Sequence, residues 1–441
     1  MAVSKKEMKI LTVVSDLHSG GVQRSAHSFV QGFRDRGHDT AVLLEEAGGE
    51  YVSKMREQGV QIFVTGADDA RHQAVRFQPD AIHVHSHNVS TSLVRFLDEK
   101  LQQATIVEHV VWDKPSPYHN QIDVSCLMSK FGLWRFETSA QQRQRNSTKV
   151  LVPNPIRTNN FYPATKNETQ SFRSQWNIPE DALVLGRVGQ SYSGKWSLLI
   201  LSTFYEVAKE YSNAHLLLRG APEGIVEAID VLPERIQSRV IQLPFLDEDQ
   251  LRRCYSAMDI FVHAAKQGET FGNVLVESML CETPIVTLST PYNDNAQVEV
   301  VGQNIGGIVA TTEAQFISAT ERLCASSELR DQLGIQGRHR AQTYFGAESS
   351  VEKVLNCFSE DIESTLSVST SEIISLLENT AGGTTFWQRL LLKTRCHNEF
   401  LTKGILDLDG SGWGRLMRMT IGHDVHLQEC ENVDTIQDLK V

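Results

Sequence analysis

The stretch "DIFVHAAKQGETFGNVLVESMLCETPIVTLS", residues 259–289, holds two short apolar runs separated by a loop and an amphipathic helical pattern. The loop contains Glu269, and the helical pattern that begins near Phe271 contains Glu277. A strand, a helix and a second strand in this order are typical of parallel α/β proteins. Both runs are almost wholly apolar, as expected of strands that helices cover on both faces. The stretch therefore predicts one unit of a doubly wound α/β domain.

The same alternation extends upstream. "LVLGRVGQ", "AHLLLRG" and "VIQLPF" are further apolar runs, and helical patterns cover residues 197–210 and 248–256. The first third of the chain repeats the rhythm with "KILTVVS", "DTAVLLEE", "VQIFVTG", "DAIHVHS" and "ATIVEHVVW", and with helical patterns at 23–36 and 50–58. Because strands that alternate with helices form parallel sheets, we expect two successive doubly wound domains.

A polar stretch rich in Asn, "RTNNFYPATKNETQ", separates the two series. We place the first domain at residues 1–165 and the second at residues 176–345. A helical pattern over 346–362 is expected to return toward the first domain, and residues 363–441 form an appended segment outside the strand-helix rhythm. In doubly wound sheets ligands bind at the carboxyl ends of the strands, so we expect the two domains to face each other across a ligand cleft.

Composition narrows the class of protein. A chain of 441 residues, 41% hydrophobic and 22% charged, exceeds a single ordinary core and is typical of soluble globular proteins. The net charge of -12 argues against nucleic acid as a partner. The seven cysteines form no C-x-x-C pair, and no apolar run approaches the ~18 residues that span a bilayer. We therefore expect a cytoplasmic protein, and any membrane contact should be peripheral at the inner face.

Spacing alone does not single out the two glutamates of the opening stretch. Pairs of Glu eight positions apart occur three times: Glu269/Glu277, Glu313/Glu321 and Glu352/Glu360. The second and third pairs lie wholly inside polar helical patterns, where solvated acids are ordinary. The first pair straddles the start of a helix, whose amides and positive dipole end suit a diphosphate. Gly272 lacks the side chain that would block close approach there.

At this point the sequence "GETFGNVLVESMLCETPIV" resembles the donor-binding motif of retaining glycosyltransferases of family 4, which have the GT-B fold of two Rossmann-like domains. The resemblance implies that Glu269 binds hydroxyls of the transferred sugar and that Glu277 binds the nucleotide ribose. It also implies that the amides of Phe271, Gly272 and Asn273 lie near the diphosphate and the sugar. The plain alternative is an α/β turn with two surface acids.

The strand that opens the second series continues as "GRVGQSYSGKWS", residues 186–197. The family commonly has an Arg followed five positions later by a Lys, and both bind the leaving diphosphate. Lys195 matches the Lys. Gln190 stands in the place of the Arg, and its neutral side chain cannot offset the charge of the departing diphosphate. Either Arg187, three positions earlier, reaches the phosphate, or Lys195 acts with helix amides alone. An exposed lysine without a role is the plain alternative.

The first domain offers a weaker signal. Gly20 and Gly21 in "DLHSGGVQRSAHSF" resemble the Gly-Gly loop of the family, whose amides approach the donor diphosphate; an ordinary tight turn is the alternative. His109 resembles the strand-end histidine that contacts the transferred sugar. His83, His85 and His87 alternate along one strand without a Cys or carboxylate ligand nearby, so we expect no metal there and interpret His85 as structural.

The resemblance implies transfer of a hexose-type glycosyl unit from a UDP- or GDP-sugar to a hydroxyl of a glycan or lipid-linked glycan, with retention of anomeric configuration. The catalytic residues would be His109, Lys195 and Glu269. The leaving diphosphate would itself take the proton of the acceptor, and neither metal nor other cofactor is expected. Gln190 supports the alternative of a non-catalytic GT-B subunit that binds a nucleotide sugar or a partner enzyme. A nicotinamide dehydrogenase is disfavoured because no G-x-G-x-x-G follows the first strand.

Two basic and aromatic stretches leave membrane contact open. They are "FWQRLLLKTRCHNEFLTKG" in the appended segment and "KFGLWRFETSAQQRQR" from Lys130. A basic helix with aromatic anchors can lie in a membrane interface. A helix whose apolar face packs on the protein, with its basic side chains in water, is the alternative that we favour for the first stretch.

Overall fold

The computed structural model describes residues 7–18, 20–65, 69–86, 88–113, 115–138, 147–291, 293–358 and 366–378. These residues form two compact units. Unit 1 takes its residues from Met1–Arg157 and Phe345–Val368, and unit 2 takes its residues from Thr158–Tyr344 and from the described part of the segment that follows Val368. His87, the basic stretch at 386–404 and residues 139–145, the end of the second basic and aromatic stretch, lie outside the described residues.

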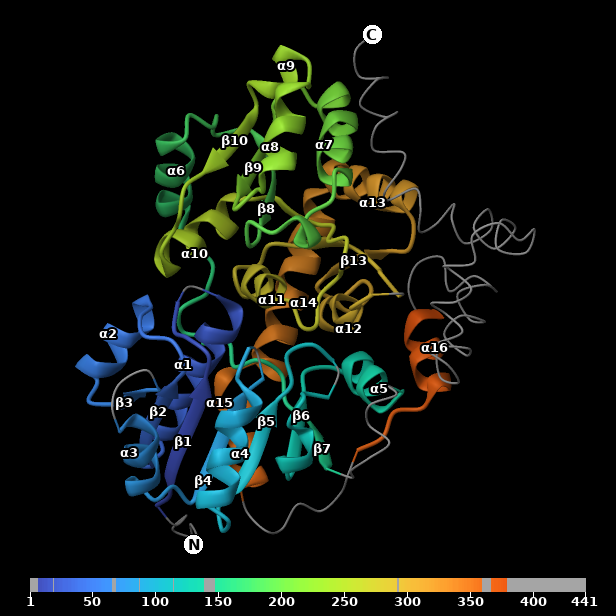
Figure 1. The fold of residues 1–441 in the computed structure, drawn as a ribbon. Helices are drawn as coiled ribbons and strands as arrows, with labels where there is room; N and C mark the ends of the chain where they lie inside the picture. The colour runs from blue at the N-terminus through green and yellow to red at the C-terminus, as the bar shows by residue number, and fades with distance from the viewer. Residues whose placement is uncertain are drawn as a thin grey trace, which may run out of the picture. The chain divides into compact units, whose positions relative to one another are not determined.

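Unit 1 is built on a seven-stranded sheet with the order β3-β2-β1-β4-β5-β6-β7, in which every pairing is parallel (Figure 1). The strands are β1 (Lys9–Val14), β2 (Asp39–Leu44), β3 (Gln61–Val64), β4 (Ala81–His85), β5 (Thr105–His109), β6 (Val124–Leu127) and β7 (Thr148–Leu151). The helices are α1 (Gly21–Arg34), α2 (Glu50–Glu57), α3 (Ala70–Arg76), α4 (Thr91–Lys100), α5 (Lys130–Thr138) and α15 (Ala347–Cys357). Because β1 lies between β2 and β4, the strand order reverses there, which is the switch point of a doubly wound sheet.

Helix α15 belongs to unit 1 although it lies far along the chain. Its Val351, Val354 and Leu355 are buried with Phe29 and Phe33 of α1 in one apolar cluster. Gly32 of α1 lets the two helices approach, because a Cβ at this position would clash with the side chain of Val351. The lack of a side chain at Gly32 thus leaves the space in which α15 packs against α1.

Unit 2 repeats the architecture with a six-stranded parallel sheet of order β10-β9-β8-β11-β12-β13 (Figure 1). The strands are β8 (Leu183–Val188), β9 (Ala214–Arg219), β10 (Val240–Leu243), β11 (Ile260–His263), β12 (Ile285–Leu288) and β13 (Gly307–Ala310). The helices are α6 (Lys166–Gln175), α7 (Leu199–Glu210), α8 (Glu223–Asp230), α9 (Glu234–Gln237), α10 (Glu248–Ala257), α11 (Asn273–Leu280), α12 (Ala296–Val301), α13 (Glu313–Ala325) and α14 (Ser327–Tyr344); α16 (Thr370–Glu378) follows later in the chain. The doubly wound α/β fold expected from the sequence is confirmed in both units.

Helices α1 and α7 each begin two positions away from where the sequence placed their starts. Helix α1 begins at Gly21 rather than Gln23, because the amide of Arg24 donates to the carbonyl of Gly20 at 3.0 Å and so closes a turn over the two glycines. Helix α7 begins at Leu199 rather than Ser197, because the Ser197 hydroxyl accepts from the amide of Leu199 at 3.2 Å and acts as a turn residue before the helix.

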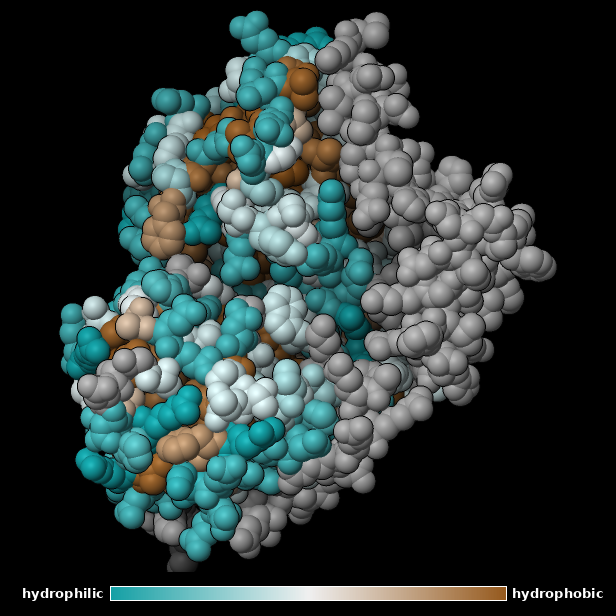
Figure 2. Space-filling view, viewed as in Figure 1, coloured by the Kyte–Doolittle hydropathy of each residue, from teal (hydrophilic) through white to brown (hydrophobic). Residues whose placement is uncertain are grey.

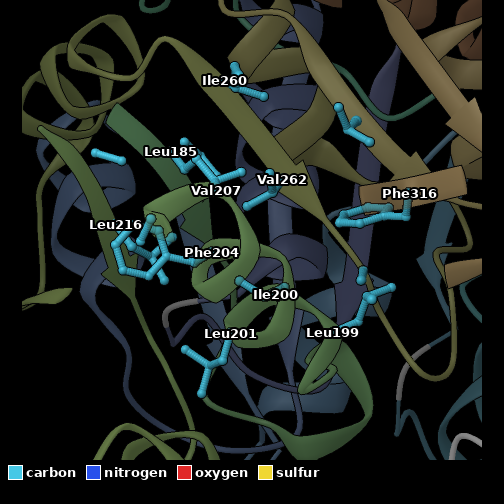
Figure 3. Close-up of a cluster of buried hydrophobic side chains, with 14 of the residues drawn as sticks. Leu185, Leu199, Ile200, Leu201, Phe204, Val207, Leu216, Ile260, Val262 and Phe316 are labelled. Atoms are coloured by element: carbon cyan, nitrogen blue, oxygen red, sulfur yellow. The ribbon is translucent and has the colours of Figure 1, made fainter. Parts of the chain in front are cut away.

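The main core of unit 2 lies between its sheet and α7 and α13 (Figure 3). Phe204 of α7 is wholly buried, and it belongs to one apolar cluster with Leu185, Leu216 and Ile260 of the strands and Phe316 of α13. In the view of Figure 2 the described surface is mainly hydrophilic, with hydrophobic residues showing in separate places. Among the described residues no helix is long and apolar enough to cross a membrane. The rigid core fixes the strand ends from which the candidate site is built.

Candidate functional site

Lys195 and Glu269 form an ion pair at the carboxyl edge of the second sheet. Lys195 ends a short 3-10 turn (Ser193–Lys195) after β8, and Glu269 lies in the loop after β11. Since β8 and β11 are neighbours in the sheet, their loops meet. The Lys195 Nζ lies 2.7 Å from the Glu269 Oε2 and donates to the carbonyl of Gly268 at 3.0 Å. The side chains are only 18% and 11% exposed, so the pair is largely withdrawn from water.

His263, the last residue of β11, holds the other oxygen of this carboxylate. Its Nε2 lies 3.1 Å from the Glu269 Oε1, and its Nδ1 lies 2.9 Å from the Thr287 Oγ1 on β12. Burial, followed by the charge of Arg187, lowers the pKa of His263 to about 4. Burial would raise the pKa of Glu269, but Lys195, the hydrogen bond with His263 and Arg187 outweigh it and hold that pKa well below its usual range. The site therefore contains an ionised carboxylate beside a neutral imidazole.

The sequence did not single out His263 or Thr287. His263 stands inside an apolar run, and Thr287 lies 24 residues away in the next strand. The one signal available was a polar residue at the end of a buried strand, six positions before Glu269.

Arg187 lies beneath the Lys195 loop and points inward. Its guanidinium donates to the carbonyls of Val188 and Lys195, each at 2.7 Å, and lies over the rings of Trp196 and Phe261 at 5.3 and 5.7 Å. The side chain is buried, which lowers the pKa of Arg187 to about 10. Arg187 thus fixes the backbone that carries Lys195, and this geometry favours the alternative in which Lys195 acts without an arginine on the phosphate. Gln190 is exposed, and its backbone carbonyl accepts from the Trp196 indole N–H at 2.8 Å.

Helix α11 begins at Asn273, two positions after Phe271, near which the sequence placed the helix start. Gly272 precedes it with φ +92°, a left-handed conformation that favours glycine, and a Cβ there would lie 2.7 Å from the Leu275 side chain. Phe271 is buried and anchors the loop, while Asn273 is the first residue of the helix. The positive end of the helix therefore lies at the Phe271–Asn273 segment.

Glu277 lies on the second turn of α11 and is almost wholly buried. Its Oε2 accepts from the hydroxyl of Tyr255, at the end of α10, at 2.9 Å. A buried carboxylate costs free energy unless hydrogen bonds satisfy it. The structure thus brings Lys195, Glu269, Phe271, Gly272 and Asn273 together around one helix start, with Glu277 on the following turn.

The remaining candidates belong to unit 1. Gly20 is extended, and Gly21 opens α1, the helix that follows β1 in the chain. His109 ends β5 but is buried, with its Nε2 3.1 Å from the Asn154 Oδ1 and its ring centroid 5.5 Å from that of His85. Burial lowers the pKa of His109 to about 4, so the ring is neutral at pH 7. Among the described residues no group of three or more His, Cys, Asp or Glu could hold a metal ion.

A substitution at Gly268, whose carbonyl accepts from Lys195, tests how closely the loop is packed against its neighbours. Its φ is +66°, and a Cβ would clash with the carbonyl oxygen of Asp294 and the Thr290 hydroxyl. We expect Gly268→Ala to lower the free energy of unfolding by about 2–4 kcal/mol, measured by chemical denaturation. Gly224→Ala in α8 is the control, because nothing lies within 4 Å of the added Cβ and Ala favours a helix. Equal stabilities of the two variants would contradict this close packing.

Comparison with known proteins shows that part of unit 2 is similar to a known family. Residues 180–326 match the family described as glycosyl transferases group 1. The curated relatives include the spore coat protein SA of Bacillus subtilis, 24% identical over 51% of this chain and 62% of that protein. The capsular polysaccharide biosynthesis glycosyltransferase CapM of Staphylococcus aureus is 25% identical over 42% of this chain and 48% of that protein. The chain thus spans about half the length of these curated relatives.

Solved structures resemble the chain over most of its length. A glycosyltransferase from Rickettsia africae has a TM-score of 0.67 at 16% identity and covers 81% of this chain and 99% of its own. Anabaena Alr3699/HepE in complex with UDP-glucose has a TM-score of 0.63 at 16% identity and covers 79% of this chain and 100% of its own. At this identity the likeness shows the fold alone. The chain therefore has the GT-B fold, and residues 180–326 of its second unit match the glycosyl transferases group 1 family.

Proposed function

We propose that the chain is a glycosyltransferase that moves a sugar from a nucleotide-sugar donor to an acceptor hydroxyl with retention of anomeric configuration. The observation that carries the proposal is the Lys195–Glu269 ion pair beside the start of α11, with Glu277 on the next turn. A diphosphate fits the cation and the positive helix end, while carboxylates accept hydrogen bonds from sugar and ribose hydroxyls. The family match over residues 180–326 supports this assignment.

The proposed roles follow from charge. Lys195 and the amides of Phe271, Gly272 and Asn273 stabilise the negative charge on the leaving diphosphate, so no metal ion is needed for that step. Glu269 binds hydroxyls of the transferred sugar, and Glu277 binds the ribose. Glu269 is engaged by both Lys195 and His263, which suits a binding group better than an attacking nucleophile. The acceptor proton therefore passes to the departing diphosphate on the same face of the sugar.

The finer parts of the proposal rest on the relatives and on unit 1. A hexose as the transferred unit, and a glycan or lipid-linked glycan as acceptor, are in keeping with CapM, whose name assigns it to capsular polysaccharide biosynthesis. A UDP-sugar is the first donor to test, because Alr3699/HepE was solved with UDP-glucose. We keep Gly20 and Gly21 as candidates for donor contact and His109 for sugar contact. A cytoplasmic location completes the proposal, and any membrane contact would be peripheral at the inner face.

Calorimetric binding of separate UDP-, GDP- and ADP-sugars tests the donor site. We expect one of these classes to bind, and Glu277→Gln to weaken it about ten- to a hundredfold, because the neutral amide loses a charge-assisted hydrogen bond to the ribose. Glu321→Gln is the matched control, since it makes the same change on α13, which carries none of the candidate site residues. If no nucleotide sugar binds, or if the two variants bind equally, the donor-site assignment is wrong.

Gln190 favours a second candidate, a non-catalytic GT-B subunit that binds a nucleotide sugar or a partner enzyme. The exposed amide of Gln190 offers no positive charge where the family has an arginine, and Arg187 is turned inward. The two candidates differ in turnover rather than in binding. Release of nucleoside diphosphate in the presence of acceptors supports the enzyme, whereas binding without release supports the subunit.

A further inference from the structure

The partners of His263 fix which of its nitrogens carries the proton. An ionised carboxylate only accepts hydrogen bonds, so the His263 Nε2, 3.1 Å from the Glu269 Oε1, must carry the hydrogen. The imidazole is neutral, because burial lowers its pKa to about 4, so its Nδ1 is left without a hydrogen. The Thr287 hydroxyl, 2.9 Å away, must then donate to Nδ1. The result is a directed chain from Thr287 through His263 to Glu269.

The two oxygens of Glu269 are held in different ways. Oε1 receives the rigid imidazole of a buried strand end, whereas Oε2 receives the flexible ammonium of Lys195 at 2.7 Å. If Lys195 binds a diphosphate, as the proposed function requires, its bond to Oε2 is shared or lost. His263 is then the side chain that still holds the carboxylate, and Oε2 faces the ligand. The Lys195–Glu269 pair is in this sense the ligand-free arrangement of the site.

We propose that His263 is a positioning residue for sugar recognition: with its ring oriented by Thr287, it holds Oε1 of Glu269 so that Oε2 is presented to the hydroxyls of the transferred sugar. The inference rests on the proposed function. It predicts that two parts of the donor are bound by different carboxylates. Glu269 binds the sugar, whereas Glu277, which accepts from Tyr255, binds the nucleoside. Loss of His263 should weaken the sugar contribution to affinity and leave the nucleotide contribution intact.

The strand register makes the chain of hydrogen bonds rigid. His263 and Thr287 are direct partners in the parallel pairing of β11 and β12, and both side chains are wholly buried. The loop that carries Glu269 is fixed separately. The backbone amide of Glu269 donates to the Gln297 Oε1 at 3.1 Å, and its backbone carbonyl accepts from the amide of Ala296 at 2.9 Å. A change at His263 can therefore alter the carboxylate while the backbone of the loop stays in place.

The test compares affinities for a nucleoside diphosphate and for its sugar conjugate, using whichever pair the wild-type chain binds: UDP with UDP-glucose, GDP with GDP-mannose, or ADP with ADP-glucose. For His263→Leu we expect the affinity for the sugar conjugate to fall about tenfold while that for the diphosphate stays within about twofold. His263→Gln, whose amide N–H can reach the carboxylate in place of Nε2–H, should recover part of the loss. Equal losses for both ligands, or no loss, would overturn the inference.

Thr287 supplies a second, milder test that does not depend on the His263 variants folding. Thr287→Val keeps the shape but removes the hydroxyl that orients the ring, and we expect a severalfold loss confined to the sugar conjugate. Thr287→Ser, which keeps the hydroxyl, is the control and should bind like the wild-type chain. Equal binding by the Val and Ser variants would contradict the role of Thr287. Failure of the wild-type chain to bind any of the six ligands would instead reject the proposed function itself.

Discussion

Replacing Lys195 by Met is expected to lower the rate of nucleoside diphosphate release from the donor about a hundred- to a thousandfold, more than any other single change at the site. The reason is electrostatic: Lys195 supplies the ammonium beside Glu269, and the neighbouring cation, Arg187, donates to backbone carbonyls instead. Removing a preorganised charge that stabilises a leaving group costs rates of this order. The measurement is steady-state release of nucleoside diphosphate with acceptor sugars present.

Lys209→Met is the matched control for this experiment. Lys209 lies on α7 of the same unit, is 44% exposed and pairs with Glu206 at 2.6 Å, so its loss removes the same charge away from the site. We expect this variant to turn over like the wild-type chain. Equal rates in the two variants would show that Lys195 does not stabilise the leaving group. Melting temperatures of both variants establish that a loss of rate is not a loss of fold.

The stability of unit 1 is expected to fall steeply in weak acid. Burial lowers the pKa of His83 and His85 well below 6.5 and that of His109 to about 4, so each ring takes up its proton more readily in the unfolded chain. Each of these groups therefore lowers the free energy of unfolding as the pH falls below 6.5, by at most about 1.4 kcal/mol per pH unit. We therefore expect the free energy of unfolding to be lower at pH 5 than at pH 7.

Glu108 opposes this trend. Burial raises its pKa from 4.5 to about 7, so in weak acid the folded state, not the unfolded one, holds the proton. Burial also lowers the pKa of His27, in the same unit, to about 4, so four imidazoles act one way and one carboxyl the other. The net expectation is a loss of stability as the pH falls from 6.5 toward 5. The measurement is urea unfolding at several pH values, with amide exchange of β4 and β5 peptides reporting on unit 1. A flat profile would contradict the buried neutral rings.

His83→Leu isolates one ring of this group. Within the described residues neither nitrogen of His83 has a hydrogen-bond partner, and the ring packs against Phe29 and Phe33. An apolar side chain should therefore raise the stability at pH 7 and reduce the pH slope by about 1.4 kcal/mol per unit. His72→Leu is the control, because that side chain is 72% exposed. An unchanged slope in His83→Leu would count against the interpretation.

Much of the fold was predictable from the sequence. The period of the apolar runs and the glycines at helix starts are local properties, so they indicated two parallel sheets and placed the loop of Glu269 before the helix of Glu277. The glutamate spacing itself was shared by two other pairs in the chain, and only its position at a helix start distinguished it. The chemistry of Lys195 was likewise predicted from a motif and not from contacts.

The sequence alone determined which residue types stand at the ends of which strands, because alternation along the chain is a local signal. The tertiary structure decided which of them meet. The register of β11 and β12 sets Thr287 beside His263, and packing beneath the β8 loop turns Arg187 inward toward Val188 and Lys195. Such pairings depend on strand register and on burial, which are properties of residues far apart in the chain. Because no local pattern encodes them, only the folded structure identified His263 as the hydrogen-bond partner of Glu269.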